Sequence, residues 1–224
     1  MNKILLVEDI NKIENGKYLI EYTKNSAINI LGTTNLSDYA TNSCDLEFTL
    51  SDGANLTLDK LNFVTKDVSL IININNDGLV NLNWVIINEG RNRINLIINM
   101  NGNNSNCSAR IRVINKDNNS NADVICDGIV LANTKDNVLI EDLKGLVHND
   151  STIKISPIMK VNTNEVMANH LVTIGAFNRD ELFYLNSKAL SDESAKNILI
   201  HSFISGILNM EMKELIPMEV IKFE

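Results

Sequence analysis

Apolar and polar residues alternate with a period of two through the middle of the chain, from about residue 46 to residue 160. Such alternation, with Ile and Val in excess, is typical of β-strands that bury one face. Between the alternating segments lie polar clusters rich in Asn and Gly, which suit tight turns because these residues tolerate positive φ. The pattern predicts a mainly β protein, with strands over residues 70–76, 80–88, 93–100, 109–114, 122–127, 138–142 and 152–155.

The spacing of these strands limits the architecture. Strands begin about every 12 to 15 residues, and no segment between them has a helical period, which excludes a doubly wound α/β fold. An antiparallel sandwich and a β-solenoid both remain. The 36 asparagines favour the solenoid mildly, because its coils turn at short Asn/Gly corners and stack identical polar side chains in ladders. A genome of low GC content explains the same excess in either fold.

The pattern changes near residue 178. Residues 178–185 fit a short helix with Asn178 as its N-cap, and residues 191–210 fit a longer helix capped by Ser191. The apolar residues of the longer helix form two adjacent rows, which are Ala195, Leu199, Phe203, Ile207 and Met210, and then Ile200, Ile204 and Leu208. A stripe this wide fits either a partner-docking surface or a helix buried under the β core. Residues 212–218 are expected to be helical or irregular, interrupted by Pro217.

Composition and charge narrow the class of protein. The 224 residues are 44% hydrophobic and 21% charged, as in an ordinary globular protein. The 28 acidic residues outnumber the 20 Lys and Arg, and no basic block occurs, so nucleic-acid binding is disfavoured. No run approaches the roughly 18 apolar residues of a membrane span, and the N-terminus lacks the features of a signal peptide. We therefore expect a cytoplasmic protein with no membrane partner.

The three cysteines, Cys44, Cys107 and Cys126, are widely spaced and form no C-x-x-C motif. This argues against a disulfide framework or an ordinary zinc knuckle. Cys126 alternates with Val124 in a predicted strand and reads most simply as a small buried side chain. Cys44 and Cys107 are assigned to Asn/Ser-rich turns and suggest no chemistry.

The sequence contains few residue patterns that would support an enzymatic activity. A carbohydrate-active β-solenoid enzyme needs clustered carboxylates on one strand face. The acids of the β region show no recurring paired arrangement (Asp123, Asp127, Glu141 and Asp142). The chain also lacks the Gly-x-x-x-x-Gly-Lys-Ser/Thr loop that binds nucleotide phosphates.

The junction between the β region and the helices carries a specific pattern over residues 156–185, SPIMKVNTNEVMANHLVTIGAFNRDELFYL. This segment resembles the closing part of the SufB/SufD family, scaffold proteins of the SUF iron–sulfur cluster assembly system. The residues that match are Pro157, Glu165, Val166, His170, Thr173, Gly175, either Asp180 or Glu181, Phe183, Tyr184, Leu185, Ser187, Ala195, Ile200 and Phe203.

The segment departs from the family at two places. Residues 188–190 read Lys-Ala-Leu where the family usually has Arg-Gly-Ile. Leu171 stands where SufD-type chains usually have Gly or Ala and SufB-type chains have Glu, so the SufD type is closer. Family members are usually longer, with an N-terminal helical region, and this chain looks like a minimal core version.

The resemblance implies a fold and a set of partners. Residues 1–177 would form a right-handed parallel β-helix, and residues 178–224 a helical region that binds a SufC-type ABC ATPase. The chain would be a non-catalytic scaffold, with ATP hydrolysis supplied by that partner. It would pair edge to edge with a SufB-like chain or with a second copy of itself. The residues expected to bind the ATPase are Leu199, Phe203, Ile204, Ile207 and Leu208.

The resemblance also implies a site for an iron–sulfur cluster assembled transiently at the subunit interface. His170 would be a ligand, which is chemically sound because neutral imidazole replaces thiolate in some iron–sulfur centres. Cys126 lies in the general region where SufB-type chains carry their cluster cysteine. Three scattered cysteines do not make a complete site, so a second chain would complete it. His148 and His201 are expected to be structural or solvent-facing, and a β-helical interaction protein without cluster chemistry is the alternative.

Overall fold

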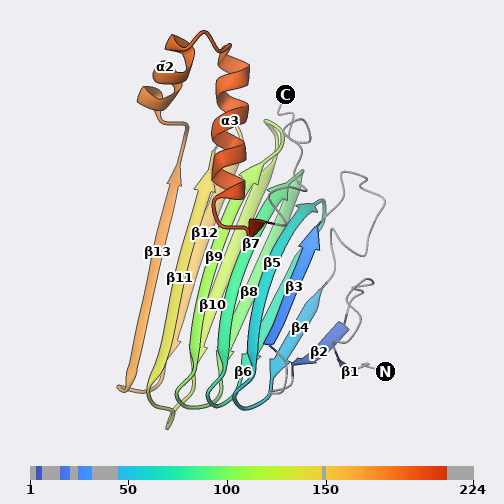
Figure 1. Cartoon of the computed structure of the whole chain (residues 1–224), viewed down its shortest axis with the longest axis vertical. Coiled ribbons are helices and arrows are strands. Elements are labelled where there is room, and N and C mark those ends of the chain that lie inside the picture. Colours follow the sequence, from blue (N-terminus) through green and yellow to red (C-terminus); the bar gives the residue numbers. More distant parts are fainter. Residues whose placement is uncertain (1–3, 7–15, 21–24, 32–44, 148–149, 211–224) are drawn as a thin grey trace.

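The computed structural model describes residues 4–6, 16–20, 25–31, 45–147 and 150–210. They form two β-sheets followed by two helices (Figure 1). Sheet A contains β1 (Ile4–Leu6), β2 (Gly16–Ile20), β4 (Leu46–Leu50), β6 (Val68–Ile74), β8 (Arg91–Met100), β10 (Asn121–Val130) and β12 (Thr152–Val161). Sheet B contains β3 (Asn25–Leu31), β5 (Asn55–Val64), β7 (Leu79–Asn88), β9 (Asn106–Asn115), β11 (Asn137–Leu146) and β13 (Val166–Gly175). The helices are α2 (Arg179–Ser187) and α3 (Asp192–Ser205).

From β4 onward the chain alternates between the two sheets, and each strand pairs in parallel with the strand one coil away. Asn121 of β10, for example, is aligned with Arg91 of β8 and with Thr152 of β12. Figure 1 shows the coils stacked side by side from the blue end of the chain to the orange end, and within each sheet all strands run in one direction. This is a parallel β-solenoid. The predicted parallel β-helix is confirmed, and the antiparallel sandwich is excluded.

The core lies between the two sheets and is built from alternate residues of each strand. In β4 and β6 every second residue is buried, as the period-two pattern requires. Phe48 of sheet A and Trp84 of sheet B are among the largest side chains that are fully buried. Because coils stack in register, inward residues of successive coils form continuous apolar rows along the solenoid.

Asparagines stack between coils, as expected for a solenoid. On the outer face of sheet A, Asn99 donates its amide to Asn73 at 2.8 Å, and Asn73 donates to Thr49 at 3.1 Å. A second stack lies inside a corner of the coils, where buried Asn88 donates to Asn115 Oδ1 at 2.8 Å. The structure therefore places asparagines at solvent-side strand positions and corners, and adds a buried corner stack that the sequence did not suggest.

Helices α2 and α3 begin at the predicted caps. The side chain of Asn178 accepts a hydrogen bond from the Asp180 amide at 2.9 Å, and that of Ser191 accepts one from the Ser194 amide at 3.2 Å. Helix α3 then packs on the outer face of sheet B, and one apolar cluster joins them. The helix, which ends at Ser205, contributes Ile200 and Ile204, and the segment just after it contributes Ile207 and Leu208. The sheet contributes Leu61, Phe63, Val85, Ile87 and Ile114.

The last coil leaves both sheets open at one end. In the part of the chain that is described, β12 and β13 are the final strands of their sheets, and each has a neighbour on one side only. Several apolar side chains of this coil are exposed, including Met167 at 60% and Leu171 at 54%. Pro157 lies within β12, where an edge strand tolerates the missing amide proton.

Within the described residues, no helix combines the length and apolar character needed to cross a membrane. Three of the features discussed from the sequence, Cys44, His148 and residues 212–218, lie outside the described residues.

Gly102 is required at the turn between β8 and β9. A Cβ atom at this position would lie 2.2 Å from the backbone nitrogen of Asn76 in the preceding coil. We expect Gly102→Ala to lower the free energy of unfolding by about 2 to 3 kcal/mol, because backbone atoms of two coils must separate. Urea denaturation measures this loss.

Gly175→Ala is the matched control, because nothing lies within 4 Å of a Cβ at Gly175. It should change the stability by less than about 0.5 kcal/mol. Equal effects of the two substitutions would contradict the close stacking of the coils at Gly102.

Candidate functional site

Two thiols and a carboxylate gather inside the solenoid near its open end. Cys107 lies on β9, Cys126 on β10 and Glu141 on β11. All three side chains are fully buried, at 0% exposure. Cys126 comes from sheet A and the other two from sheet B, so the group spans the interior between the sheets.

Small neighbours make room for the carboxylate of Glu141. A Cβ at Gly128 of the opposite sheet would lie 2.7 Å from Glu141 Oε1, so the glycine leaves the space that the carboxylate fills. On the adjacent strand, the residue aligned with Glu141 is Ala109. Among the described residues, no well-formed hydrogen bond satisfies either carboxylate oxygen. The weak thiol donor of Cys126 is close enough to interact with the group.

Burial controls the protonation of this cluster. Loss of hydration raises the pKa of Glu141 from 4.5 to about 7, although the Cys126 thiol opposes the shift. The nearby charge of Asp127 raises that pKa further. Burial, reinforced by Glu141, raises the pKa of both Cys107 and Cys126 well above the ordinary thiol value. The two cysteines are therefore thiols in the isolated chain.

His170 extends the cluster to the surface. It lies on β13, the last strand of sheet B, and is aligned with Glu141 of β11. Aligned residues on adjacent parallel strands point to the same side of the sheet, and the strands lie about 4.8 Å apart. Glu141 is enclosed, whereas His170 is exposed because no further described coil covers it. The two metal ligands expected from the sequence, Cys126 and His170, thus lie at one end of the solenoid with Glu141 between them.

Within the described residues, no group of three or more His, Cys, Asp or Glu side chains is placed to hold a metal ion. The thiol, carboxylate and imidazole are types of iron ligand, but the buried members and the exposed His170 do not form a preorganised metal cage.

The assignment of Cys107 to a turn was wrong. The Asn/Ser-rich cluster ends at Asn106, and Cys107 is the first inward residue of β9. From the sequence, Glu141 is only one of several acids that lack the paired arrangement expected of a carbohydrate-active enzyme. Its position between Leu139 and Leu143, both fully buried, marks it as a polar residue in an inward row. His201, expected to be structural or solvent-facing, is half-buried on α3.

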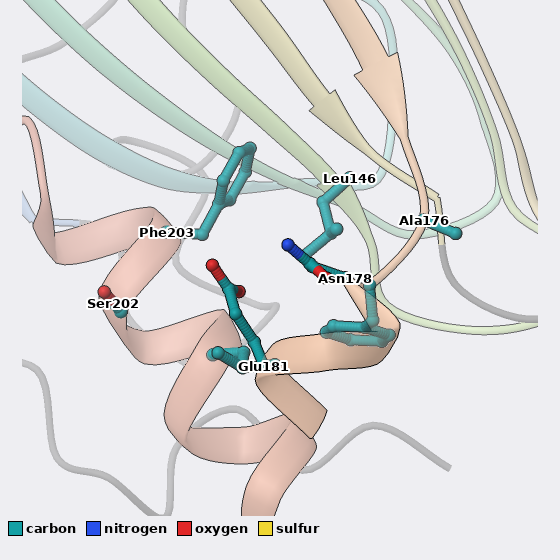
Figure 2. A pocket seen from close by; sticks show the side chains of 8 residues that line it. Leu146, Ala176, Asn178, Glu181, Ser202 and Phe203 are labelled. Carbon is teal, nitrogen blue, oxygen red and sulfur yellow. The ribbon is translucent and has the colours of Figure 1, made fainter. Parts of the chain in front are cut away.

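The five residues expected to bind a partner separate into two groups. Ile204, Ile207 and Leu208 are buried against sheet B of the same chain. Leu199 and Phe203 are half-buried and line a pocket between α2, α3 and the end of β11 (Figure 2).

The loop between α2 and α3 contains a strained residue where the sequence departs from the SufB/SufD pattern. Ala189 has a φ of 66°, in the left-handed region that favours glycine. The chain therefore keeps a backbone conformation suited to the Gly of the usual Arg-Gly-Ile turn, although it carries Ala there.

Fold and site together define a parallel β-solenoid that bears an interior thiol–carboxylate cluster at its open end and two helices after its last coil. Comparison with known proteins narrows this class. Residues 132–203 match a family model described as "SUF system FeS cluster assembly, SufBD core domain". This segment contains Glu141, His170, Leu199 and Phe203, but neither Cys107 nor Cys126.

A protein of Synechocystis sp., described as an iron–sulfur cluster assembly SufBD family protein, is 35% identical over 57 residues. The alignment covers 25% of this chain and 13% of that protein. Both comparisons support a relationship to the SufB/SufD family, with a link to SUF iron–sulfur cluster assembly. Neither separates the SufD type from the SufB type.

The raised pKa of Glu141 makes stability depend on pH. The folded chain holds a proton on Glu141 between pH 4.5, the ordinary value, and about 7, whereas the unfolded chain has released it. This group stabilises the fold at low pH, and the contribution is lost as the pH rises through about 7. Relative to Glu141→Gln, the free energy of unfolding of the wild type should fall by on the order of 3 kcal/mol from pH 4.5 to pH 8.

Urea denaturation across this pH range measures the difference. Glu165→Gln, at an exposed position before β13, is the control and should retain the wild-type pH dependence. An unchanged pH dependence in Glu141→Gln would show that the carboxylate is not buried as described.

Proposed function

We propose that this chain is a SufD-like, non-catalytic scaffold of iron–sulfur cluster assembly, on which a cluster is assembled as cargo at a subunit interface. The observation that carries the proposal is the alignment of exposed His170 with buried Glu141, which in turn interacts with Cys126. His170 and Glu141 both lie in the segment similar to the SufBD core. Thiolate, imidazole and carboxylate are all competent iron ligands.

In this proposal a second β-helical chain completes the site. His170 lies on the open edge strand, so an incoming chain that pairs with β13 would place its own side chains beside the imidazole. Unpaired strand edges readily accept another strand, and the exposed apolar residues Met167, Leu171 and Ile174 would become covered. The partner is a SufB-like chain or a second copy of this one.

The helices supply the docking surface for a SufC-type ATPase in this proposal. No residue of α2 is buried, and its Phe183 and Tyr184 are 76% and 60% exposed. Aromatic residues are enriched among those that carry binding energy at interfaces. On α3, Leu199 and Phe203 line the pocket beside α2, while Ile200 and Ile204 hold the helix on sheet B. The ATPase would bind the outer side of a helix pair already fixed to the solenoid.

His170→Ala tests the cluster site. After anaerobic reconstitution with ferrous iron and sulfide, in the presence of the pairing chain, its iron affinity should fall about tenfold or more, because a ligand has been removed. Iron content per chain and visible charge-transfer absorbance measure the loss. His201→Ala is the control, since His201 lies on α3, and it should bind iron normally. Equal iron retention in all three proteins would remove His170 from the site and favour an interaction protein without cluster chemistry.

Phe203→Asp tests the ATPase interface. A charge in the pocket wall should weaken pull-down of a SufC-type ATPase from the same genome by at least about thirtyfold, as at other buried interface aromatics. Leu79→Asp is the control, because Leu79 is 38% exposed at the start of β7, at the end of the strands away from α2 (Figure 1). Circular dichroism and urea denaturation confirm that both variants fold. Unchanged pull-down by Phe203→Asp contradicts the docking role.

A further inference from the structure

The pocket between α2 and α3 has a volume of about 290 Å³. Its apolar walls are the side chains of Leu146, Phe177, Leu199 and Phe203, and Ala176 closes one side. Pockets for cofactors and other small molecules usually measure about 300 to 1,000 Å³. A pocket at the lower limit of that range suits one long side chain better than a cofactor.

Glu181 is the charged residue among those that line this pocket. Figure 2 shows its carboxylate pointing into the space between Phe203 and Asn178. In the part of the chain that the structure describes, Glu181 forms no ion pair. The two lysines of this helical region have other partners, since Lys196 pairs with Asp192 at 2.7 Å and Lys188 lies over the ring of Tyr184 at 5.4 Å.

We infer that this pocket receives an arginine side chain of the protein that docks on the helices. This inference rests on the proposed docking role of α2 and α3, and it specifies which type of side chain the partner places on that surface. The expected ligand is a cation, because the Glu181 carboxylate supplies a negative charge at one end of a pocket with apolar walls. The aliphatic stem of the arginine contacts Leu146 and Leu199, as long basic side chains do on apolar surfaces.

The aromatic rings favour a guanidinium over an ammonium head. Phe177 and Phe203 both line the pocket, and a planar, weakly hydrated guanidinium stacks on aromatic faces. The same head donates two parallel hydrogen bonds to a carboxylate such as Glu181, which an ammonium does not.

Titration of the full chain with n-butylguanidinium tests the inference without the ATPase. Saturable NMR shifts are expected at Leu199 and Phe203. Glu181→Gln should weaken the binding about three- to fivefold, because the charge-assisted pair of an exposed carboxylate is lost. Glu193→Gln is the control, since Glu193 lies in the first turn of α3 and does not line the pocket. The neutral isostere n-butylurea should bind at least about tenfold more weakly than n-butylguanidinium.

The outcomes separate this inference from the proposed function. Equal binding of the urea and the guanidinium, or full binding by Glu181→Gln, overturns the inference even if the ATPase is captured. Guanidinium binding that depends on Glu181 supports the inference even if a SufC-type ATPase is not captured, and in that case the proposed partner is wrong. In pull-downs that do capture the ATPase, Glu181→Gln should weaken capture and Glu193→Gln should not.

Discussion

The structure depends on one constraint, the in-register hydrogen bonding of parallel strands from one coil to the next. Each strand must present its inward residues directly beside those of its neighbours, so side chains from coils 24 residues apart in sequence, such as Leu46 and Leu70, become adjacent. The same constraint stacks Asn73 with Asn99 outside the sheets. It also determines which residues meet at the candidate site, since Glu141 is aligned with His170 by the ladder and not by a local motif.

The hydrogen-bonded ladder ends at the last described coil, so the residues of the candidate site lie in two different environments, one enclosed and one exposed. Glu141 has a coil on either side and is fully enclosed, whereas His170, one strand further, has a neighbour on one side only. A buried carboxylate without a strong partner is costly, and here that cost is limited because burial keeps the group protonated up to about pH 7. The space beside Gly128 lets the side chain cross the interior without displacing sheet A. The interior therefore tolerates the cluster for two reasons. Small neighbouring residues leave room for it, and burial holds the Glu141 carboxyl in its uncharged form.

The alternation in the sequence predicted the strands well, because period two depends only on which face of a strand is buried. It left the sandwich and the solenoid open, and the parallel β-helix was expected from the resemblance to the SufB/SufD family. The sequence also predicted both helix caps, which are local hydrogen bonds. It did not predict the cluster, because Cys107, Cys126 and Glu141 come from three strands and their meeting depends on coil length. Cys107 was misplaced because the Asn/Ser-rich cluster extends to Asn106, which is already the first residue of β9. The wide apolar stripe of α3 fits both a docking surface and a buried helix, and the sequence alone did not show that Ile204 packs on its own sheet while Phe203 lines a pocket.

Helix α3 links the two regions that carry the proposed function. Its inner row packs on β5, β7 and β9, and the backbone amide of Asn209, just beyond the helix, donates to Asp59 Oδ2 of β5 at 3.3 Å. Asp59 is itself buried and hydrogen-bonded to Asn83, which accepts from Arg110 at 2.8 Å. These polar contacts cross three neighbouring strands of sheet B, so the helix is held at its end by side chains as well as by apolar packing. A partner bound on the outer side of α3 would therefore act on several coils together.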